Sequence, residues 1–372
     1  MNIIAIAGSR IPSGTANSIQ VMKTCQALNQ LGHELTLLVP GAAADQAWDS
    51  LAVFYGLQSH FKVEWLPGRS RRWFSWRAVQ RARKLQPDLL YVWMPQSAVL
   101  GLLFGLPVIF EVHIQPSGLL GPAWHRLFAR LPGCKRLVCI TRALQQVLEK
   151  EHGINLRPEQ VVIAPNGVDL ERFASLPDPE TARRQLGLPQ ALTVACSGHL
   201  YAGRGADLFL ALAQGKPQVQ FLWVGGRPED VKEWRRRTKR QGLNNVTFSG
   251  FVTNKELPLY QAAANILLMP YGRSIAGSSG GDSAAIASPM KMFEYMAAGR
   301  AIMTSDLPVI REVLNETNAV FCPPEDVRSW QEALDDLLAD PGRCACLARQ
   351  ARLDVEKYTW LERAGKVLSG FL

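Results

Sequence analysis

The chain has 372 residues, of which 47% are hydrophobic and 20% charged, an ordinary globular mixture that excludes a disordered polypeptide. Because domains commonly span about 100–200 residues, this length predicts two domains. The longest apolar stretch, residues 97–110, is shorter than the roughly 20 residues that span a bilayer, so we expect no transmembrane helix.

The formal net charge is +9, and the excess lies in the first half of the chain. Residues 1–157 contain 17 Lys and Arg against 8 Asp and Glu, whereas the rest has 24 of each (41 less 17, and 32 less 8). Such a charge attracts anionic lipid or another polyanion, or simply aids solubility. The seven cysteines show no zinc-ligand spacing and predict reduced thiols in a cytoplasmic protein without a structural metal.

In chain order, the apolar residues 2–7 predict a buried parallel strand rather than a signal peptide. A Gly- and Ser-containing loop at 8–17 precedes a helix over 18–31, which ends at Gly32, and a strand over 34–39. This strand–helix–strand unit is the building block of a parallel sheet. The pattern then continues with strands expected at 89–93, 107–112, 136–140 and 160–164, and helices at 97–104 and 143–152.

A polar stretch at residues 170–190, which contains three prolines, predicts a linker. A second series follows, with strands expected at 193–197, 221–224, 246–248, 266–269, 301–304 and 319–321, and helices at 207–214, 228–241, 254–263, 289–298, 327–339 and 361–371. We therefore expect an α/β protein with two Rossmann-like, doubly wound parallel-sheet lobes, at 1–170 and 171–355, and a C-terminal helix within 356–372 that packs back on the first lobe. Ligands of such sheets bind at the carboxyl ends of the strands, which predicts a cleft between the lobes.

The segment from Ser288 to Arg300 follows a loop rich in Gly, Ser and Ala at 276–287. Ser288 is expected to cap a helix and Pro289 to take its first position. The open N–H groups and the positive dipole end at such a start bind phosphate. Glu294, one to two turns later, is placed to accept hydrogen bonds from the hydroxyls of a ribose. A helix after a Gly-rich loop is common, so this signal alone is weakly specific.

Taken whole, residues 288–305 resemble the donor-binding segment of the retaining glycosyltransferases of family 4, which have the GT-B fold. The resemblance implies that a nucleotide-sugar donor is bound by Ser288, Met290, Lys291 and Glu294, with Glu294 on the ribose. The first of the two glutamates of that family would fall at Ile286, a departure for which Asp282 is the nearest alternative carboxylate.

Two further segments carry the same resemblance. Residues 197–205 follow the first strand of the second lobe and match the basic pair of the family, with His199 at the first position and Arg204 at the second. Arg204 is implied to neutralise the pyrophosphate, whose negative charge grows as the glycosidic bond breaks; without the resemblance it would be a solvated loop residue. Residues 164–173 also match the family, at the turn that leaves the first lobe.

In the first lobe, Gly14 lies in a loop that faces the donor in this family and permits close backbone approach. His113, at the end of a predicted strand, matches a histidine that contacts the donor sugar, although a lone histidine there is more often structural. Glu111 beside it is expected to be a buried, hydrogen-bonded support. Phe251 and Val252 follow another strand, in the loop implied to hold the nucleobase.

The resemblance implies a retaining hexosyltransferase that moves a sugar from a nucleotide-sugar donor, UDP-linked rather than GDP-linked, to a hydroxyl of a lipid-linked or polysaccharide acceptor. The implied catalytic residues are Arg204, His113 and Glu294. The donor phosphate would help to deprotonate the acceptor in a front-face attack, and we expect no metal and no cofactor. The alternatives are a nucleotide-sugar epimerase of the same fold and a non-catalytic nucleotide-sugar-binding protein.

Residues 69–84 combine seven basic residues with aromatic ones and contain no acidic residue. This pattern suits an anionic membrane surface, and the residues that we expect to face it or the acceptor are Arg71, Arg72, Trp73, Trp76 and Arg77. Single-stranded nucleic acid is compatible with the pattern, and so is a solvated helix that packs its aromatics on the lobe. We expect a cytoplasmic protein that is peripheral on the inner face of the membrane and has no nucleic-acid partner.

Overall fold

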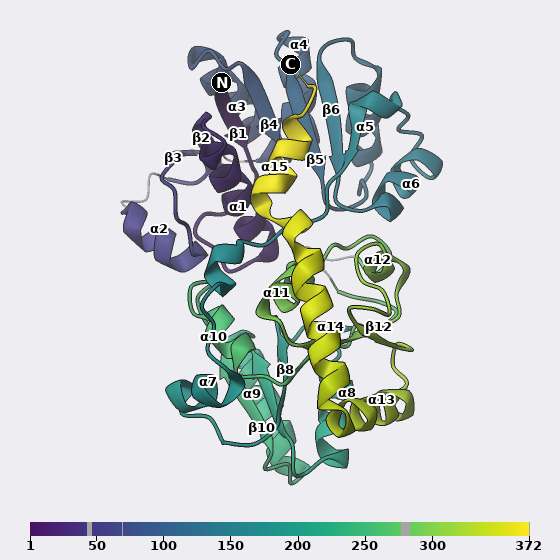
Figure 1. The fold of residues 1–372 in the computed structure, drawn as a ribbon. Coiled ribbons are helices and arrows are strands. Elements are labelled where there is room, and N and C mark those ends of the chain that lie inside the picture. The colour runs from purple at the N-terminus through teal and green to yellow at the C-terminus, as the bar shows by residue number, and fades with distance from the viewer. Residues whose placement is uncertain (43–46, 69, 277–282, 372) are drawn as a thin grey trace. The chain divides into compact units, whose positions relative to one another are not determined.

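The computed structural model describes residues 1–42, 47–68, 70–276 and 283–371. The chain forms two compact units (Figure 1). The first comprises Met1–Gly167 together with Trp360–Leu372, and the second comprises Val168–Thr359. The boundaries expected from the sequence, 170 and 355, lie a few residues from these junctions.

The first unit is built on a seven-stranded sheet with the order β3-β2-β1-β4-β5-β6-β7, in which all neighbouring strands are parallel. Its strands are β1 (Asn2–Ile6), β2 (Glu34–Pro40), β3 (Lys62–Leu66), β4 (Leu89–Val92), β5 (Val108–Val112), β6 (Lys135–Cys139) and β7 (Val161–Ile163). The order reverses between β1 and β4, which makes the sheet doubly wound and opens a ligand position at the carboxyl ends of these strands.

The helices of the first unit are α1 (Ala16–Gln30), α2 (Trp48–Tyr55), α3 (Arg71–Lys84), α4 (Pro95–Leu103), α5 (Gly121–Arg130), α6 (Arg142–Lys150) and α15 (Trp360–Leu368), with a 3-10 turn at Pro158–Gln160. Because parallel crossovers are right-handed, the reversal of strand order places α1 and α2 on one face of the sheet and α3 to α6 on the other. The C-terminal helix α15 lies against α1 (Figure 1). Of these elements, α2, β3 and α5 were not predicted from the sequence.

Arg136 on β6 fixes the end of α15. Its guanidinium donates to the carbonyl oxygens of Val367 at 2.6 Å, Ser369 at 2.9 Å and Gly370 at 3.3 Å. The last carbonyls of a helix lack partners within the helix and carry its negative dipole end, so a cation stabilises them. The C-terminal segment is therefore an integral part of the first unit.

The second unit contains a six-stranded parallel sheet with the order β10-β9-β8-β11-β12-β13. Its strands are β8 (Thr193–Ser197), β9 (Gln220–Val224), β10 (Val246–Gly250), β11 (Ile266–Met269), β12 (Ala301–Ser305) and β13 (Val320–Cys322). Its helices are α7 (Pro179–Leu186), α8 (Ala206–Gly215), α9 (Pro228–Arg240), α10 (Leu257–Ala262), α11 (Met290–Ala298), α12 (Pro308–Arg311), α13 (Val327–Ala339) and α14 (Pro341–Asp354), with 3-10 turns at Leu170–Phe173 and Val355–Tyr358. Here the strand order reverses between β8 and β11.

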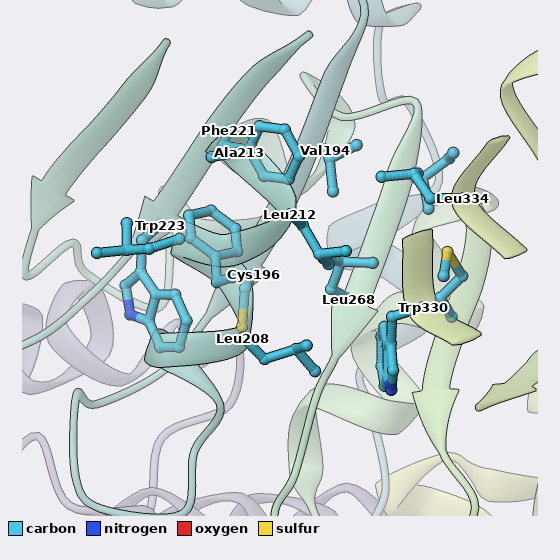
Figure 2. Packing of buried hydrophobic residues seen from close by; sticks show 14 of the residues in the cluster. Val194, Cys196, Leu208, Leu212, Ala213, Phe221, Trp223, Leu268, Trp330 and Leu334 are labelled. Carbon is cyan, nitrogen blue, oxygen red and sulfur yellow. The ribbon is translucent and has the colours of Figure 1, made fainter. Parts of the chain in front are cut away.

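The core of the second unit lies between this sheet and the helices α8 and α13 (Figure 2). Phe221 and Trp223 on β9 pack edge to face with Phe209 of α8, and all three rings are fully buried. The indole N–H of Trp223 donates to the carbonyl oxygen of Gly198 at 2.9 Å. The core therefore also fixes the first residue of the loop that follows β8.

Two local expectations are wrong. Residues 170–190 are not a simple linker, because they contain helix α7. The Asp178 carboxylate caps this helix by accepting a hydrogen bond from the Thr181 N–H at 3.0 Å. Pro179 takes the first helical position, where an N–H would have no partner within the helix. Helix α11 begins one residue later than expected, so that Pro289 and not Ser288 stands at the cap position. No described helix is both long and apolar enough to cross a membrane.

Candidate functional site

Two loops of the second unit meet where its strand order reverses. Residues 198–205 follow β8, and residues 270–289, described outside 277–282, follow β11 and lead into α11. They are joined by backbone hydrogen bonds from Gly272 N–H to Gly203 O at 2.9 Å and from Ala276 N–H to Ala202 O at 3.1 Å. The carboxyl ends of adjacent strands at such a reversal are the usual ligand position of doubly wound sheets.

The close approach of these two loops requires glycine at two positions of the loop after β8. Gly203 and Gly205 have φ angles of +75° and +83°, in the left-handed region that side chains disfavour. A Cβ atom at Gly203 would lie 1.8 Å from the carbonyl oxygen of Ser274, and one at Gly205 would lie 1.9 Å from that of Pro270. The Gly203-Arg204-Gly205 sequence therefore holds Arg204 against the neighbouring loop.

Arg204 and Lys291 converge on one aromatic ring. The Arg204 guanidinium donates to the Tyr271 hydroxyl at 3.2 Å and lies 5.3 Å from the centre of its ring, and the Lys291 ammonium lies 4.6 Å from the same centre. Tyr271 is 2% exposed, and both cations are half-buried. No carboxylate in the described ranges pairs with either cation, and both lie close to the Tyr271 ring, whose face attracts positive charge.

The start of α11 is anchored to the end of β8. The buried Tyr295 hydroxyl accepts from the Ser197 N–H at 2.7 Å, and the Lys291 ammonium donates to the Cys196 sulfur at 3.6 Å. Burial raises the pKa of the Cys196 thiol, and Lys291 opposes this effect. The thiol is therefore a neutral hydrogen-bond partner for the Lys291 ammonium.

Two other residues expected to bind the donor have polar or aromatic partners in the second unit. The Glu294 carboxylate accepts from the Gln261 amide at 3.2 Å. His199 stacks on Tyr201 with ring centres 4.9 Å apart, and the Tyr201 hydroxyl accepts from Arg227 at 3.1 Å. His199 thus lies nearly parallel to the ring of Tyr201, which Arg227 contacts in turn.

The remaining expected residues differ in exposure. Ser288 and Ile286 are buried, and Met290 is half-buried at the first position of α11. Phe251 and Val252 follow β10, and Phe251 is 51% exposed. Phe251 lies at an open groove of about 560 Å³ that it shares with side chains of α9. Asp282 lies outside the described residues.

In the first unit, Gly14 lies in the loop between β1 and α1, which two aromatic residues hold in place. The Tyr55 hydroxyl accepts from the Ser13 N–H at 2.7 Å, and the Trp65 indole donates to the carbonyl oxygen of Ile11 at 3.0 Å. The loop is thereby fixed on both sides of Pro12.

His113 follows β5, next to the reversal point of the first sheet, and its Nε2 lies 2.6 Å from Oε1 of Glu111. Glu111 is 1% exposed, and Arg363 of α15 binds it with both terminal nitrogens, at 2.7 Å and 3.2 Å. Burial alone would raise the pKa of Glu111, but the charge of Arg363 and the hydrogen bond from His113 outweigh it and lower the pKa to about 2. Glu111 is therefore an ionised buried carboxylate.

Three contributors escaped the sequence analysis. Tyr271 and Gln261 contact predicted site residues, and Arg363 contacts Glu111, the expected support beside His113. Each belongs to another element than the residue it contacts. Of the three, Tyr271 could have been predicted, because it lies two residues after the end of the buried strand β11, at the reversal point. In the described part of the chain, no three His, Cys, Asp or Glu side chains are grouped to hold a metal ion.

Helix α3 presents the basic aromatic segment. Ser70 caps the helix by accepting from the Trp73 N–H at 3.3 Å. Phe74 packs into the unit, while Trp73 and Trp76 are 45% and 43% exposed. Arg71 and Arg72 are exposed, and Arg77 lies 5.5 Å from the centre of the Trp73 ring. Arg69 lies outside the described residues.

Sequence comparison agrees with the two-unit architecture. The family described as Glycosyltransferase Family 4 matches residues 18–172, and the family described as Glycosyl transferases group 1 matches residues 191–340. The two matches together span most of the chain. The chain belongs to glycosyltransferase family 4. The family predicted from residues 164–173, 197–205 and 288–305 is thus confirmed.

Solved structures confirm the GT-B fold of this family-4 member. HepE from Anabaena, in a complex with UDP, aligns with a TM-score of 0.74 at 19% identity, over 99% of this chain and 98% of HepE. At that identity the likeness concerns the fold alone.

Two curated relatives are similar in sequence. The D-inositol 3-phosphate glycosyltransferase of Xylanimonas cellulosilytica is 28% identical over 62% of this chain and 55% of its own length. The GDP-mannose-dependent monoacylated alpha-(1-6)-phosphatidylinositol monomannoside mannosyltransferase of Corynebacterium glutamicum is 30% identical over 56% of this chain and 55% of its own length. The chain spans about half the length of these relatives.

Proposed function

We propose that this family-4 member is a retaining hexosyltransferase that binds a nucleotide-sugar donor on its second unit and transfers the sugar to an acceptor hydroxyl. The observation that carries the proposal is the convergence of Arg204 and Lys291 on Tyr271 at the start of α11. Two half-buried cations without a carboxylate partner in the described residues form a site for a doubly charged anion, and a diphosphate fits that charge.

The chemistry follows from where negative charge grows. When the bond between sugar and diphosphate breaks, the leaving nucleoside diphosphate gains charge, and positive groups already in place stabilise the transition state more than the ground state. Arg204 and Lys291 supply this charge, together with the positive dipole end of α11, which carries Lys291 in its first turn. The proposed scheme contains no metal ion, because two protein cations take that role.

In this proposal the other site residues contact and orient the donor. Glu294 accepts from the ribose hydroxyls, and Gln261 holds its carboxylate in place. His199 lies beside the pyrophosphate, with Ser288 and Met290 at the helix start. Phe251 and Val252 border the nucleobase, and in the first unit Gly14 and His113 lie near the donor sugar. The donor phosphate helps to deprotonate the acceptor, which leads to retention of the anomeric configuration.

For the donor base, we keep the UDP-linked sugar as the first hypothesis. The rival is a GDP-linked sugar, which the name of the 30%-identical relative from Corynebacterium glutamicum supports. A panel of both classes distinguishes them.

For the acceptor, we propose a lipid-linked molecule reached from the first unit, with α3 on an anionic membrane surface at the cytoplasmic side. The exposed Trp73 and Trp76 beside Arg71 and Arg72 support this, because a bulky aromatic and a cation together suit the interface of a bilayer. The patch continues to Phe104, directly after α4, whose ring centre lies 5.9 Å from that of Trp76 and 4.2 Å from the Arg83 guanidinium. The name of the Corynebacterium glutamicum relative likewise contains a phosphatidylinositol acceptor.

The test is a panel of UDP-, GDP- and ADP-linked sugars, with thermal stabilisation and nucleoside diphosphate release as readouts. A donor at a hundred times its Kd should raise the free energy of unfolding by about 2.7 kcal/mol. Arg204→Met and Lys291→Met should each remove this effect, whereas Arg349→Met, an exposed position on α14, should leave it intact. Stabilisation without release in the presence of lipid-linked acceptors would indicate a binding protein, and no stabilisation by any donor would refute the proposal.

A further inference from the structure

The first unit buries a polar network that the donor site on the second unit does not explain. Its centre is Glu111, at the carboxyl end of β5, which contacts groups from four directions. Gln20 of α1 donates to Oε1 at 2.5 Å, Tyr91 of β4 donates to Oε2, His113 contacts Oε1, and Arg363 of α15 binds both oxygens. Only His113 reaches the surface, with 16% of its side chain exposed.

The ionisation of Glu111 is set by a residue from the far end of the chain. Arg363 is 5% exposed, and its Nε donates to the carbonyl oxygen of Pro165 at 2.8 Å, so all three of its nitrogens are engaged. A buried carboxylate without such a cation would take up a proton. A protonated Glu111 would compete with His113 for the role of hydrogen-bond donor.

An ionised carboxylate only accepts hydrogen bonds, so the imidazole nitrogen beside it must carry the proton. The contact of 2.6 Å therefore assigns the proton to Nε2 of His113. In the neutral ring this leaves the lone pair on Nδ1, for which no residue in the described ranges is a hydrogen-bond partner.

We propose that Glu111 and Arg363 are positioning residues that hold the His113 ring with Nε2 protonated, so that Nδ1 accepts a hydrogen bond from a hydroxyl group of the substrate. This protonation state makes the His113 ring selective for the kind of group that it binds. A neutral Nδ1 acceptor takes a group that donates a proton, such as a sugar hydroxyl, and disfavours a carboxylate or phosphate oxygen at the same place. The role in substrate binding rests on the proposed transferase function, whereas the protonated nitrogen of His113 is a property of the protein alone.

The first measurement therefore needs no substrate. The full chain is labelled with ¹⁵N in its histidine rings, and two-bond proton–nitrogen spectra at pH 8.5 show which nitrogen carries the proton. The His113 signals are assigned by their disappearance in His113→Asn. We expect the Nε2–H form in the wild type and loss of this preference in Glu111→Gln. A wild-type ring that carries its proton on Nδ1 would overturn the proposal, whatever the enzyme transfers.

The second measurement separates positioning from a merely structural role. Glu111→Gln should lower kcat/KM roughly tenfold or more in the wild-type background and have little further effect in His113→Ala. A structural defect would instead lower activity by the same factor in both backgrounds, and that result would contradict the proposal. His113→Asn, whose amide oxygen can take the place of Nδ1, should retain at least about tenfold more activity than His113→Gln, whose amide lies nearer the place of Nε2.

Discussion

At the scale of single residues, the loop after β8 depends on glycines for steric reasons that can be isolated. Gly203→Ala places a Cβ atom against the carbonyl oxygen of Ser274 at a φ of +75°, and a backbone atom cannot move away cheaply. Gly242 has a similar φ of +68° with nothing within 4 Å of a new Cβ, so Gly242→Ala is a matched control. We expect about 1 kcal/mol of destabilisation for the control and at least about 2 kcal/mol more for Gly203→Ala in urea unfolding.

Thermal stabilisation by the donor is a second measurement that distinguishes Gly203→Ala from Gly242→Ala. Gly203→Ala should also abolish stabilisation by the donor, because Arg204 follows it directly, while Gly242→Ala should leave donor stabilisation unchanged. Equal destabilisation by the two substitutions would mean that the loop shifts freely, and the fixed position of Arg204 would lose its support.

Glu111 predicts a pH dependence of stability. Its pKa is about 2 in the folded protein against an ordinary value of 4.5, so the folded state binds its proton less tightly than the unfolded chain does. The resulting stabilisation, on the order of 3 kcal/mol, is complete above about pH 4.5 and is lost as the pH falls towards 2. The difference in free energy of unfolding between wild type and Glu111→Gln should shrink over this window in denaturant titrations. A difference that stays constant with pH would show that Glu111 is protonated in the folded state.

Some residues of the candidate site could be predicted from the sequence, and others could not. Arg204 and Lys291 are adjacent to recognisable loops and a helix start, so the sequence places both at the reversal point of the sheet. Tyr271 brings them together, but this contact exists only because β8 and β11 are neighbours in space. The contact between Arg363 and Glu111 could not be predicted, because the two residues are 252 positions apart and no local sequence pattern connects them.

At the scale of elements, α15 belongs to the first unit through specific contacts at its end, and this predicts the effect of one substitution. Arg136→Met removes the hydrogen bonds to the last carbonyls of α15, and hydrogen bonds to charged groups are each worth about 1.5–3 kcal/mol. We expect a loss of at least about 2 kcal/mol in the free energy of unfolding and faster hydrogen–deuterium exchange in residues 360–371. Arg130→Met, on the exposed side of α5, is the control and should change neither quantity. Unchanged exchange in the Arg136 variant would show that the other contacts of α15, with α1 and through Arg363 with Glu111, hold the helix without Arg136.

Elements with strong caps and periodicity could be predicted, and weakly marked ones could not. Helix α13 has the bounds expected from the sequence, because the Asp326 carboxylate caps it and three buried side chains repeat along one face. Strand β3 was not predicted, because it pairs only with β2 at the sheet edge and has no fully buried residue. Helix α7 was mistaken for a linker because Pro179 was taken as a breaker, although a proline starts a helix well when a capping residue precedes it.

At the scale of the whole molecule, the uneven charge gives the membrane proposal a test with a built-in control. Arg71→Gln, Arg72→Gln and Arg77→Gln together remove three charges from α3 in the first unit. Lys232→Gln, Arg236→Gln and Lys239→Gln remove three from α9, a helix of the second unit that has as many basic residues as α3 but also has acidic ones. Each basic residue at an anionic surface contributes about 1 kcal/mol, so the α3 triple should weaken binding to phosphatidylserine-containing vesicles on the order of a hundredfold at 100 mM salt. The α9 triple should weaken it several-fold at most.

The comparison of the two triples in vesicle co-sedimentation determines what the charge does. Equal weakening would mean that net charge, and not α3, draws the protein to the surface, while no weakening by either would refute membrane contact. Trp73→Ala with Trp76→Ala separates the aromatic contribution, because these exposed rings carry no charge. If α3 lies on the bilayer, this pair should weaken binding at 500 mM salt as well as at 100 mM, whereas the effect of the arginines should fade at the higher ionic strength, where the Debye length drops below about 5 Å. A salt-independent effect of the arginines would instead indicate that they bind a discrete acceptor group rather than the charged surface.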